Sequence, residues 1–265
     1  MTGRRFISRQ QRFPRVGSTN DVVRGWLDDG TPEVCLAVAD EQTAGRGREG
    51  RTWQAAAGAA LLLSLGFRPK WLPPNLVWRL AASVSLAMAE ASEAVAGLAA
   101  GTIRLKWPND LVVERDGHAL KLAGVLGETD GLGTADARAV VGIGVNADWA
   151  AHDFPPELAS GMTSLREIAG SRPIDRTELL AAFTALLEGR VGALRDGRFD
   201  AAGWTARQAT TGRTVTIETH GGRREVAAAV DVDPETGALV VQAGDGSPRS
   251  VVSAEVVHLR LAGGV

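Results

Sequence analysis

One segment dominates the sequence: residues 40–53, DEQTAGRGREGRTW, in which three glycines and three arginines alternate between two apolar runs. Glycine permits positive φ angles and lets backbone N–H groups come close to a ligand. Arginine presents a planar fork of donors that suits carboxylate and phosphate oxygens. Because three guanidinium groups within six positions repel one another, we expect residues 45–51 to be mobile when empty and to close over an acidic ligand. The alternative is a solvated Arg/Gly surface loop.

The same segment excludes two common nucleotide-binding motifs. It is not a Walker loop, because no Gly-Lys-Ser/Thr follows it. Residues 45–50 have the Gly-x-Gly-x-x-Gly spacing of a dinucleotide-binding turn, but bulky charged side chains occupy the turn. No amphipathic helix begins at Gly50, as that fold would require.

The segment resembles instead the GRGRxGRxW signature of biotin protein ligases, here GRGREGRTW at residues 45–53. Four further motifs agree with this family in the expected order: STN at 18–20, KWPNDL at 106–111, KLAG at 121–124 and GIGVN at 142–146. One departure is Gly127, where an aliphatic residue is common in the family. Five ordered motifs make the resemblance specific over residues 18–146, and it extends more weakly over the rest of the chain. We call residues 45–53 the lid segment.

Hydrophobic patterning predicts an α+β fold. Apolar runs predict strands and apolar residues at helical spacing predict helices, without strict alternation of the two. The predicted strands are residues 34–39, 59–67, 103–106, 111–115, 118–126 and 139–145, and the predicted long helices are residues 75–95 and 176–194. We therefore expect a mixed sheet with helices mainly on one face. The resemblance implies the fold shared by biotin ligases, lipoate ligases and class II aminoacyl-tRNA synthetases.

The composition changes after Ala209, where short strands alternate with glycine-rich turns. Four or five strands in about fifty residues predict a small β-barrel. It resembles the SH3-like C-terminal barrel of biotin ligases. We therefore expect a catalytic domain at residues 1–208 and a small barrel at residues 209–265.

One predicted hairpin places two charged motif residues together. Asp116-Gly117 is a strong two-residue turn signal. From that turn, Val112 faces Lys121 and Asp110 faces Ala123. Lys121 and Asp110 then project from one face as diagonal neighbours, roughly 7–8 Å apart. Lys121 is then an anion ligand, or alternatively a charged residue that protects an edge strand.

Net charge and targeting signals narrow the function classes. A net charge of −2 gives the molecule no overall field that would attract nucleic acid. The local exception is a group of arginines near the start, either on a solvated strand or in a basic arm: Arg4, Arg5, Arg9, Arg12 and Arg15. No apolar run approaches the ~20 residues of a membrane span, and no secretion signal follows the first arginines. We expect a cytoplasmic protein that binds neither nucleic acid nor membrane.

Cysteine and histidine usage argues against a redox or transition-metal site. Cys35 is the single cysteine and lies in an apolar run, so we expect a buried thiol. The four histidines lie far apart in the sequence, without metal-ligand spacing.

The resemblance implies a two-step ATP-dependent reaction. The carboxylate of biotin attacks the α-phosphate of ATP and gives biotinyl-5′-AMP and pyrophosphate. A lysine amine of a biotin carboxyl carrier domain of a carboxylase then attacks the mixed anhydride. Both steps gather negative charge, so the catalyst is expected to be positioned cations together with Mg²⁺.

The resemblance also implies the site residues. Those for biotin are Ser18, Thr19, Asn20, Gln42, Gly45, Arg46, Lys121 and Gly124. Those for ATP and the adenylate are Arg48, Arg51, Trp53, Lys106, Asn109 and Asn146. The catalytic residues are Lys121, Arg48 and Asp110, and Asp110 is also placed for Mg²⁺. Two plainer interpretations stay open: a helix cap for Ser18, and core packing for Trp53 and Trp107.

Two other function classes share part of this pattern. A lipoate or octanoate transferase needs an apolar tunnel, whereas Ser18, Thr19, Asn20 and Gln42 favour a polar ureido ring. A biotin-responsive transcription regulator needs a DNA-reading domain, and only seventeen residues precede Ser18. We therefore expect the short form of the ligase without a DNA-binding domain, as a monomer or weak homodimer.

Overall fold

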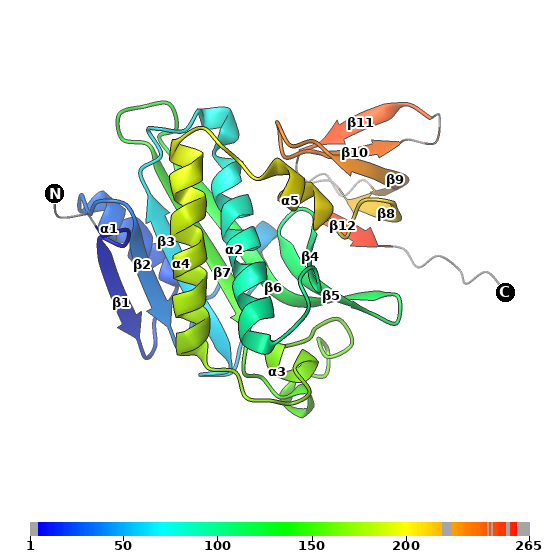
Figure 1. Cartoon of the computed structure of the whole chain (residues 1–265), viewed down its shortest axis with the longest axis horizontal. Coiled ribbons are helices and arrows are strands. Elements are labelled where there is room, and N and C mark those ends of the chain that lie inside the picture. Colours follow the sequence, from blue (N-terminus) through cyan, green and yellow to red (C-terminus); the bar gives the residue numbers. More distant parts are fainter. Residues whose placement is uncertain (1–4, 219–223, 243, 245, 253–254, 259–265) are drawn as a thin grey trace.

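Two β-sheets organise the computed structural model, which describes residues 5–218, 224–242, 244, 246–252 and 255–258 (Figure 1). The larger sheet has seven strands in the order β1-β2-β3-β7-β6-β5-β4. Its strands are β1 Arg9–Phe13, β2 Cys35–Ala39, β3 Ala60–Phe67, β4 Ile103–Lys106, β5 Asp110–Arg115, β6 His118–Asp130 and β7 Arg138–Asn146. β1 and β2 run parallel and the other neighbours run antiparallel, so the predicted mixed sheet is confirmed.

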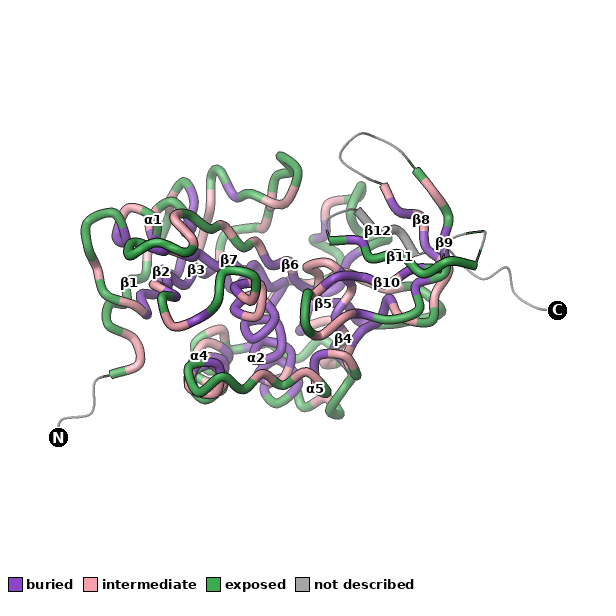
Figure 2. Tube along the Cα trace, turned by 90° about the horizontal axis from the view of Figure 1, so that it is seen from above, coloured by how far each residue is buried: buried purple, intermediate pink, exposed green. Residues whose placement is uncertain are grey.

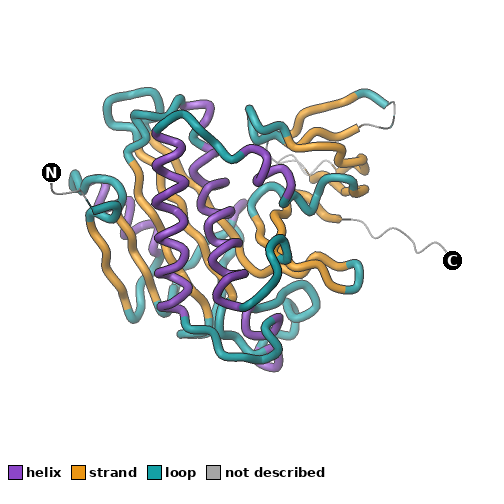
Figure 3. The backbone as a smooth tube through the Cα atoms, viewed as in Figure 1, coloured by secondary structure: helices purple, strands orange, loops and turns teal. Residues whose placement is uncertain are grey.

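The helices cover the two faces of this sheet unequally. They are α1 Thr19–Asp28, α2 Trp78–Ala96, α3 Leu165–Ile168, α4 Arg176–Arg195 and α5 Ala201–Ala206, with 3-10 turns at Arg48–Gly50, Pro74–Leu76 and Ala151–Asp153. The long helices α2 and α4 lie side by side on one face (Figure 3), while α1 lies on the other (Figure 2). The prediction of helices mainly on one face is confirmed.

The alternation of side chains along β2 explains this arrangement. Leu36 and Val38 point into the large core shared with α2 and α4. Cys35 and Ala37 point the other way and pack against α1 through Val23. On β2 the face towards α1 therefore carries small side chains, and Cys35 is fully buried there, as predicted. Burial raises the pKa of its thiol to about 11.

The hairpin of β5 and β6 follows the predicted turn but not the whole predicted register. Asp116 and Gly117 both have positive φ, as a two-residue hairpin turn requires. Val112 faces Lys121 as predicted, whereas Asp110 faces Gly124 and not Ala123. The register shifts between Leu111 and Val112, because a β-bulge inserts one extra residue into β6.

The second sheet is antiparallel and follows α5. Its strands are β8 Arg213–Glu218, β9 Arg224–Val232, β10 Leu239–Gln242, β11 Pro248–Val251 and β12 Glu255–His258. They lie in the order β11-β10-β9-β8-β12. Within the described residues β11 and β12 are its two edges, so the predicted barrel is observed as a five-stranded sheet without closure. The predicted end of the last strand, beyond His258, lies outside the described residues, and the division at residue 208/209 stays a prediction.

Three of the arginines near the start of the chain form intramolecular contacts, while Arg4 lies outside the described residues. The Arg9 guanidinium lies 4.0 Å from the centroid of the Trp26 ring. Arg12 pairs with Asp40 at 2.7 Å, and Arg15 pairs with Glu41 at 3.1 Å. These contacts favour the strand interpretation over the basic arm. No helix in the described part of the chain has the length and apolarity to cross a membrane.

A buried ion pair fixes where the chain leaves the large sheet. Glu93 of α2 and Arg207 after α5 form a bidentate pair at 2.8 and 2.9 Å, and Glu93 also accepts a hydrogen bond from the Ile103 N–H. Their side chains are only 5% and 13% exposed. Removing one partner of such a pair leaves the other charge buried without compensation.

We therefore expect Glu93→Ala to lower the free energy of unfolding by about 3 kcal/mol, measured by urea denaturation. Glu235→Ala is the matched control, because Glu235 also pairs with an arginine, Arg79, but is 80% exposed. Its loss is expected to stay below about 1 kcal/mol. Equal losses in the two variants would show that the Glu93 pair is not a structural anchor.

Candidate functional site

A cavity of about 400 Å³ lies on the α1 side of the large sheet, between the start of α1, the lid segment and the strands β6 and β7. Among its lining residues are predicted site residues from every motif: Ser18, Thr19, Asn20, Gln42, Arg46, Arg48, Arg51, Trp53, Lys106, Asn109, Asp110, Lys121, Gly124 and Asn146. Gly45, which also belongs to the predicted set, lies at the base of the lid segment. The motifs are therefore brought together around one cavity, although their ligand contacts stay predictions.

Glycines form the floor of the cavity. Gly124 of β6 pairs directly with Gly144 of β7, so two neighbouring strands lack side chains at the same level. A Cβ atom at Gly144 would lie 2.5 Å from the Trp53 indole, and one at Gly124 would lie 3.1 Å from it. Trp53 is half-buried in this hollow and packs against the small buried cluster of Ala39, Ala60 and Leu62. In contrast, Trp107 is 4% exposed and belongs to the large core, as the packing interpretation predicted.

Neutral polar groups line one end of the cavity, which we call the head end. Thr19 donates its backbone N–H and its hydroxyl to Gln42 Oε1, at 2.7 and 3.0 Å. The Ser64 hydroxyl lies 2.7 Å from the Thr19 hydroxyl and 2.6 Å from Asn20 Oδ1. Ser18 is the N-cap residue of α1, as the helix-cap interpretation predicted, but its side chain makes no capping hydrogen bond. This end offers hydrogen bonds without net charge.

Cations surround the other end. Lys121 Nζ lies 2.7 Å from Asp110 Oδ1, which confirms that the two side chains project from one face. The bulge in β6 also brings Lys121 beside Gly124, where a Cβ would lie 3.4 Å from Nζ. Lys106 and Arg48 stand close enough to influence Asp110, and burial lowers the pKa of each. With Arg51 nearby, positive charge exceeds negative charge, as a site for carboxylate or phosphate groups requires.

The lid segment is a short folded hairpin over this cavity. Arg46 and Thr52 form an antiparallel bridge, and the backbone N–H of Trp53 donates to Gly45 O at 3.0 Å. A Cβ at Gly45 would lie 2.6 Å from the carbonyl oxygen of Trp53, so glycine is required at the base of the hairpin. Its loss of order when empty stays a prediction.

Asn109 and Asn146 bind the protein's own backbone. Asn109 donates its side-chain amide to Val125 O at 2.8 Å, and Asn146 donates to Thr163 O at 3.0 Å. Both residues line the cavity and both fix neighbouring segments around it. Their predicted contact with the adenylate stays a prediction.

The sequence did not indicate several residues that line the cavity or support the residues that do. Ser64, Asp21 and Glu128 complete the polar network at the head end, and only Ser64, a serine in an apolar strand, gives a local signal. In the segment 157–162, to which no motif belongs, five residues line the cavity: Glu157, Leu158, Ser160, Gly161 and Met162. This segment is fixed to the strand of Lys121, whose N–H donates to Gly161 O at 2.8 Å.

The donor set for a metal ion is small. In the described residues no group of three His, Cys, Asp or Glu side chains could hold a metal. Asp110 is a carboxylate that Lys121 already contacts, so it can supply one ligand at most. One carboxylate together with phosphate oxygens and water is a normal environment for Mg²⁺ bound with a nucleotide. The site therefore fits Mg²⁺ only in the company of phosphate groups.

Comparison with known families matches most of the chain. The biotin/lipoate A/B protein ligase family matches residues 12–146, and the biotin protein ligase C-terminal domain matches residues 210–259. The biotin–[acetyl-CoA-carboxylase] ligase of Mycobacterium tuberculosis is 34% identical over 248 residues, which cover 93% of this chain and 87% of the relative. The bifunctional ligase/repressor BirA of Bacillus subtilis is 32% identical over 66% of this chain, but the match spans only 51% of that relative.

Solved structures show the same architecture. The biotin protein ligase of Aquifex aeolicus in complex with biotin and ATP superposes with a TM-score of 0.77 at 24% identity, covering 96% of this chain and 100% of that one. The Leishmania major biotin protein ligase in complex with biotinyl-5-AMP gives a TM-score of 0.57 at 26% identity, covering 92% and 99%. These likenesses agree with the mixed sheet and the second, smaller sheet.

The glycine floor can be tested by adding one methyl group. Gly144→Ala places a Cβ against the Trp53 indole, so we expect the lid segment to be displaced. Tryptic cleavage after the lid arginines, located by mass spectrometry, should become about tenfold faster. Gly127→Ala is the matched control, because Gly127 lies on β6 with nothing within 4 Å of a Cβ. Equal cleavage rates in the two variants would refute this role of Gly144.

Proposed function

The chain belongs to the biotin protein ligases of the biotin/lipoate A/B protein ligase family, and we propose that it activates biotin with ATP and transfers it to a protein lysine. The acceptor is a biotin carboxyl carrier domain of a carboxylase. One observation carries this proposal: a single cavity combines a neutral hydrogen-bonding end with an end where cations exceed carboxylates. A molecule with an uncharged polar ring and a distant carboxylate, such as biotin, matches both ends.

In the first step the head end binds the ureido ring through Ser18, Thr19 and Gln42. The carboxylate of biotin then lies towards Lys121. One of its oxygens attacks the α-phosphorus of ATP, the bond from that phosphorus to the bridging oxygen breaks, and pyrophosphate leaves. Negative charge accumulates during this displacement, and cations fixed in advance around it lower the barrier.

Arg48, Arg51 and Lys106 supply that positive charge together with Lys121. Burial disfavours the charged forms of Arg48 and Lys106, as their lowered pKa values indicate. A bound polyphosphate relieves this cost, because it adds the negative charge that the cluster lacks. Mg²⁺, when bound with the nucleotide, would neutralise phosphate oxygens, with Asp110 as its protein ligand.

In the second step the acceptor lysine amine attacks the carbonyl carbon of the mixed anhydride. A C–N bond forms, the bond between that carbon and the phosphate oxygen breaks, and AMP leaves. The proton that the amine loses passes to the solvent, and the negative charge of the Asp110 carboxylate attracts the incoming amine. The lid segment shields the anhydride from water between the two steps.

Pyrophosphate release tests the substrate directly. MgATP is supplied with biotin, lipoate or octanoate separately, and no acceptor is present. Release with biotin alone is expected, because the head end is polar and hydrogen-bonded. Release with lipoate or octanoate alone would agree with the fold but would show that biotin is not the substrate. Absence of release with all three would favour a binding protein.

Lys121 is tested by truncation. We expect Lys121→Ala to slow pyrophosphate release at least about 100-fold, because loss of one preorganised charge-stabilising group has an effect of this order. Lys70→Ala is the control, since Lys70 is an exposed lysine outside the cavity. Near-normal release by Lys121→Ala would assign the catalytic role to another cation.

A further inference from the structure

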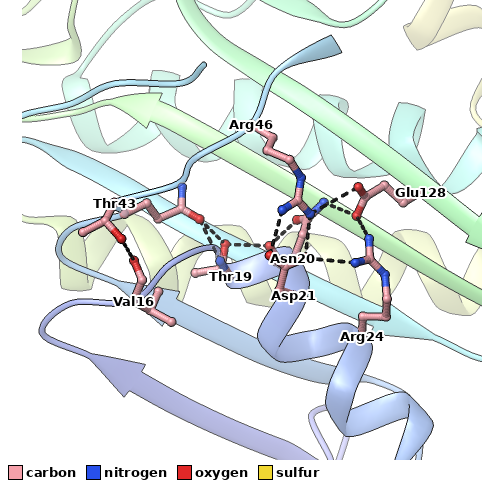
Figure 4. A network of polar contacts seen from close by, with 10 residues as sticks. Val16, Thr19, Asn20, Asp21, Arg24, Thr43, Arg46 and Glu128 are labelled. Atoms are coloured by element: carbon pink, nitrogen blue, oxygen red, sulfur yellow. Dashed lines mark hydrogen bonds and ion pairs between the residues drawn. The ribbon is translucent and has the colours of Figure 1, made fainter. Parts of the chain in front are cut away.

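The three lid arginines have different surroundings. Arg46 forms two parallel hydrogen bonds of 2.7 Å to the carboxylate of Asp21 on α1, and its guanidinium also reaches Glu128 on β6 at 3.4 Å. Arg24 joins the same two carboxylates, at 2.9 Å to Asp21 and 2.7 Å to Glu128. Two guanidinium groups and two carboxylates thus alternate in a ring that has no net charge (Figure 4). We call these four residues the charge ring.

Arg48 and Arg51 lie in surroundings where the charges do not balance. They lie near Lys106 and Lys121 in the cation cluster, where positive charge exceeds negative charge even with Asp110 and Glu49 counted. An anion is needed to balance that cluster. The charge of Arg46 is therefore balanced within the ring, while the cluster that contains Arg48 and Arg51 keeps a positive excess that a bound anion can balance.

The charge ring is connected to the head end of the cavity. Asn20 donates its side-chain amide to Glu128 Oε2 at 2.8 Å, while its Oδ1 lies 2.6 Å from the Ser64 hydroxyl. Asn20 fills the space left by the missing side chain of Gly142, where a Cβ would lie 2.2 Å from that Oδ1. Asp21 is the next residue on α1. Thr19 and Asn20 at the head end and Asp21, which anchors the lid segment, therefore lie in the same turn of α1.

We propose that Asp21, supported by Glu128, is a positioning residue that anchors Arg46 and so sets how long the activated intermediate stays in the cavity. This inference rests on the proposed function and adds a regulatory contact to it. Arg46 keeps one end of the lid segment attached to both walls of the cavity. Closure then requires ordering only of the part that contains Arg48 and Arg51.

The exposure of the ring gives the proposal a second observable. The Arg46 and Asp21 side chains are 36% and 49% exposed, so salt screens their attraction. A bidentate pair within a network is stronger than an isolated surface pair, which is worth at most about 1 kcal/mol. We therefore expect the release rate of the intermediate from the wild-type protein to rise with ionic strength.

The test uses the full chain in a single turnover with labelled ATP and biotin, followed by a chase without acceptor. Asp21→Asn is expected to release the adenylate about tenfold faster, to form it at a rate within about twofold of wild type, and to lose most of the salt dependence. Glu128→Gln should show a smaller increase in release. This second variant is needed because Asp21 lies in the first turn of α1, where its charge also favours the helix.

Asp196→Asn is the matched control, since it removes another exposed pair, between Asp196 and Arg198 at 2.9 Å, outside the site. It should behave as wild type does. The proposal fails if Asp21→Asn releases the adenylate at the wild-type rate. It also fails if formation, release and melting temperature all worsen together, because that pattern indicates a general loss of structure.

Hydrogen exchange of residues 45–53 separates this proposal from the proposed function. The measurement needs no substrate, and Asp21→Asn is expected to exchange about tenfold faster there than wild type. If the wild-type protein forms no adenylate but this difference in exchange appears, the proposed function is refuted while the anchoring of Arg46 by Asp21 is supported. If adenylate forms and exchange is unchanged, the activity stands and the anchor is wrong.

Discussion

The site depends on the absence of side chains at one level of a buried sheet. Gly124 and Gly144 are direct partners on neighbouring strands, and Gly142 lies two residues along on the same face. The Trp53 ring and the Asn20 amide fill the space that Cβ atoms would take. A sheet interior normally favours branched side chains, so these glycines weaken the strands in exchange for a hollow. The large core on the opposite face, packed against α2 and α4, supplies the rigidity that the hollow removes.

The two ends of this hollow differ in how their charges are balanced. Beside the head end, the charges of Asp21, Arg24, Arg46 and Glu128 balance one another within the charge ring. At the other end, the cluster around Lys121 keeps an excess of positive charge. The first arrangement fixes structure without ligand. The second is suited to bind an anion, whose negative charge would offset that excess.

Sequence reasoning succeeded where the signal is local. The turn at Asp116 and Gly117, the strand at residues 103–106 and the meeting of Asp110 with Lys121 all follow from a few adjacent residues. The bulge in β6 could not be predicted in this way, because it depends on how two strands pack and not on one turn. The contact between Asn20 and Glu128 joins residues 108 positions apart, and neither residue type alone indicates the other. Closure of the second sheet likewise depends on edge pairing that short strands do not specify.

The C-terminal part of the chain also contacts the motif that carries Lys106 and Asp110. Trp107 lies between Lys106 and the Asn109–Asp110 pair, and its indole N–H donates to Gly237 O at 3.0 Å. Its backbone N–H donates to the Thr210 hydroxyl at 3.1 Å. Gly237 has a φ of 73° and packs against the Trp78 ring so closely that a Cβ would lie 2.8 Å away. A buried tryptophan that is satisfied only by the C-terminal part of the chain ties the geometry of Lys106 and Asp110 to the docking of that part, which gives the second sheet a structural reason to accompany this site.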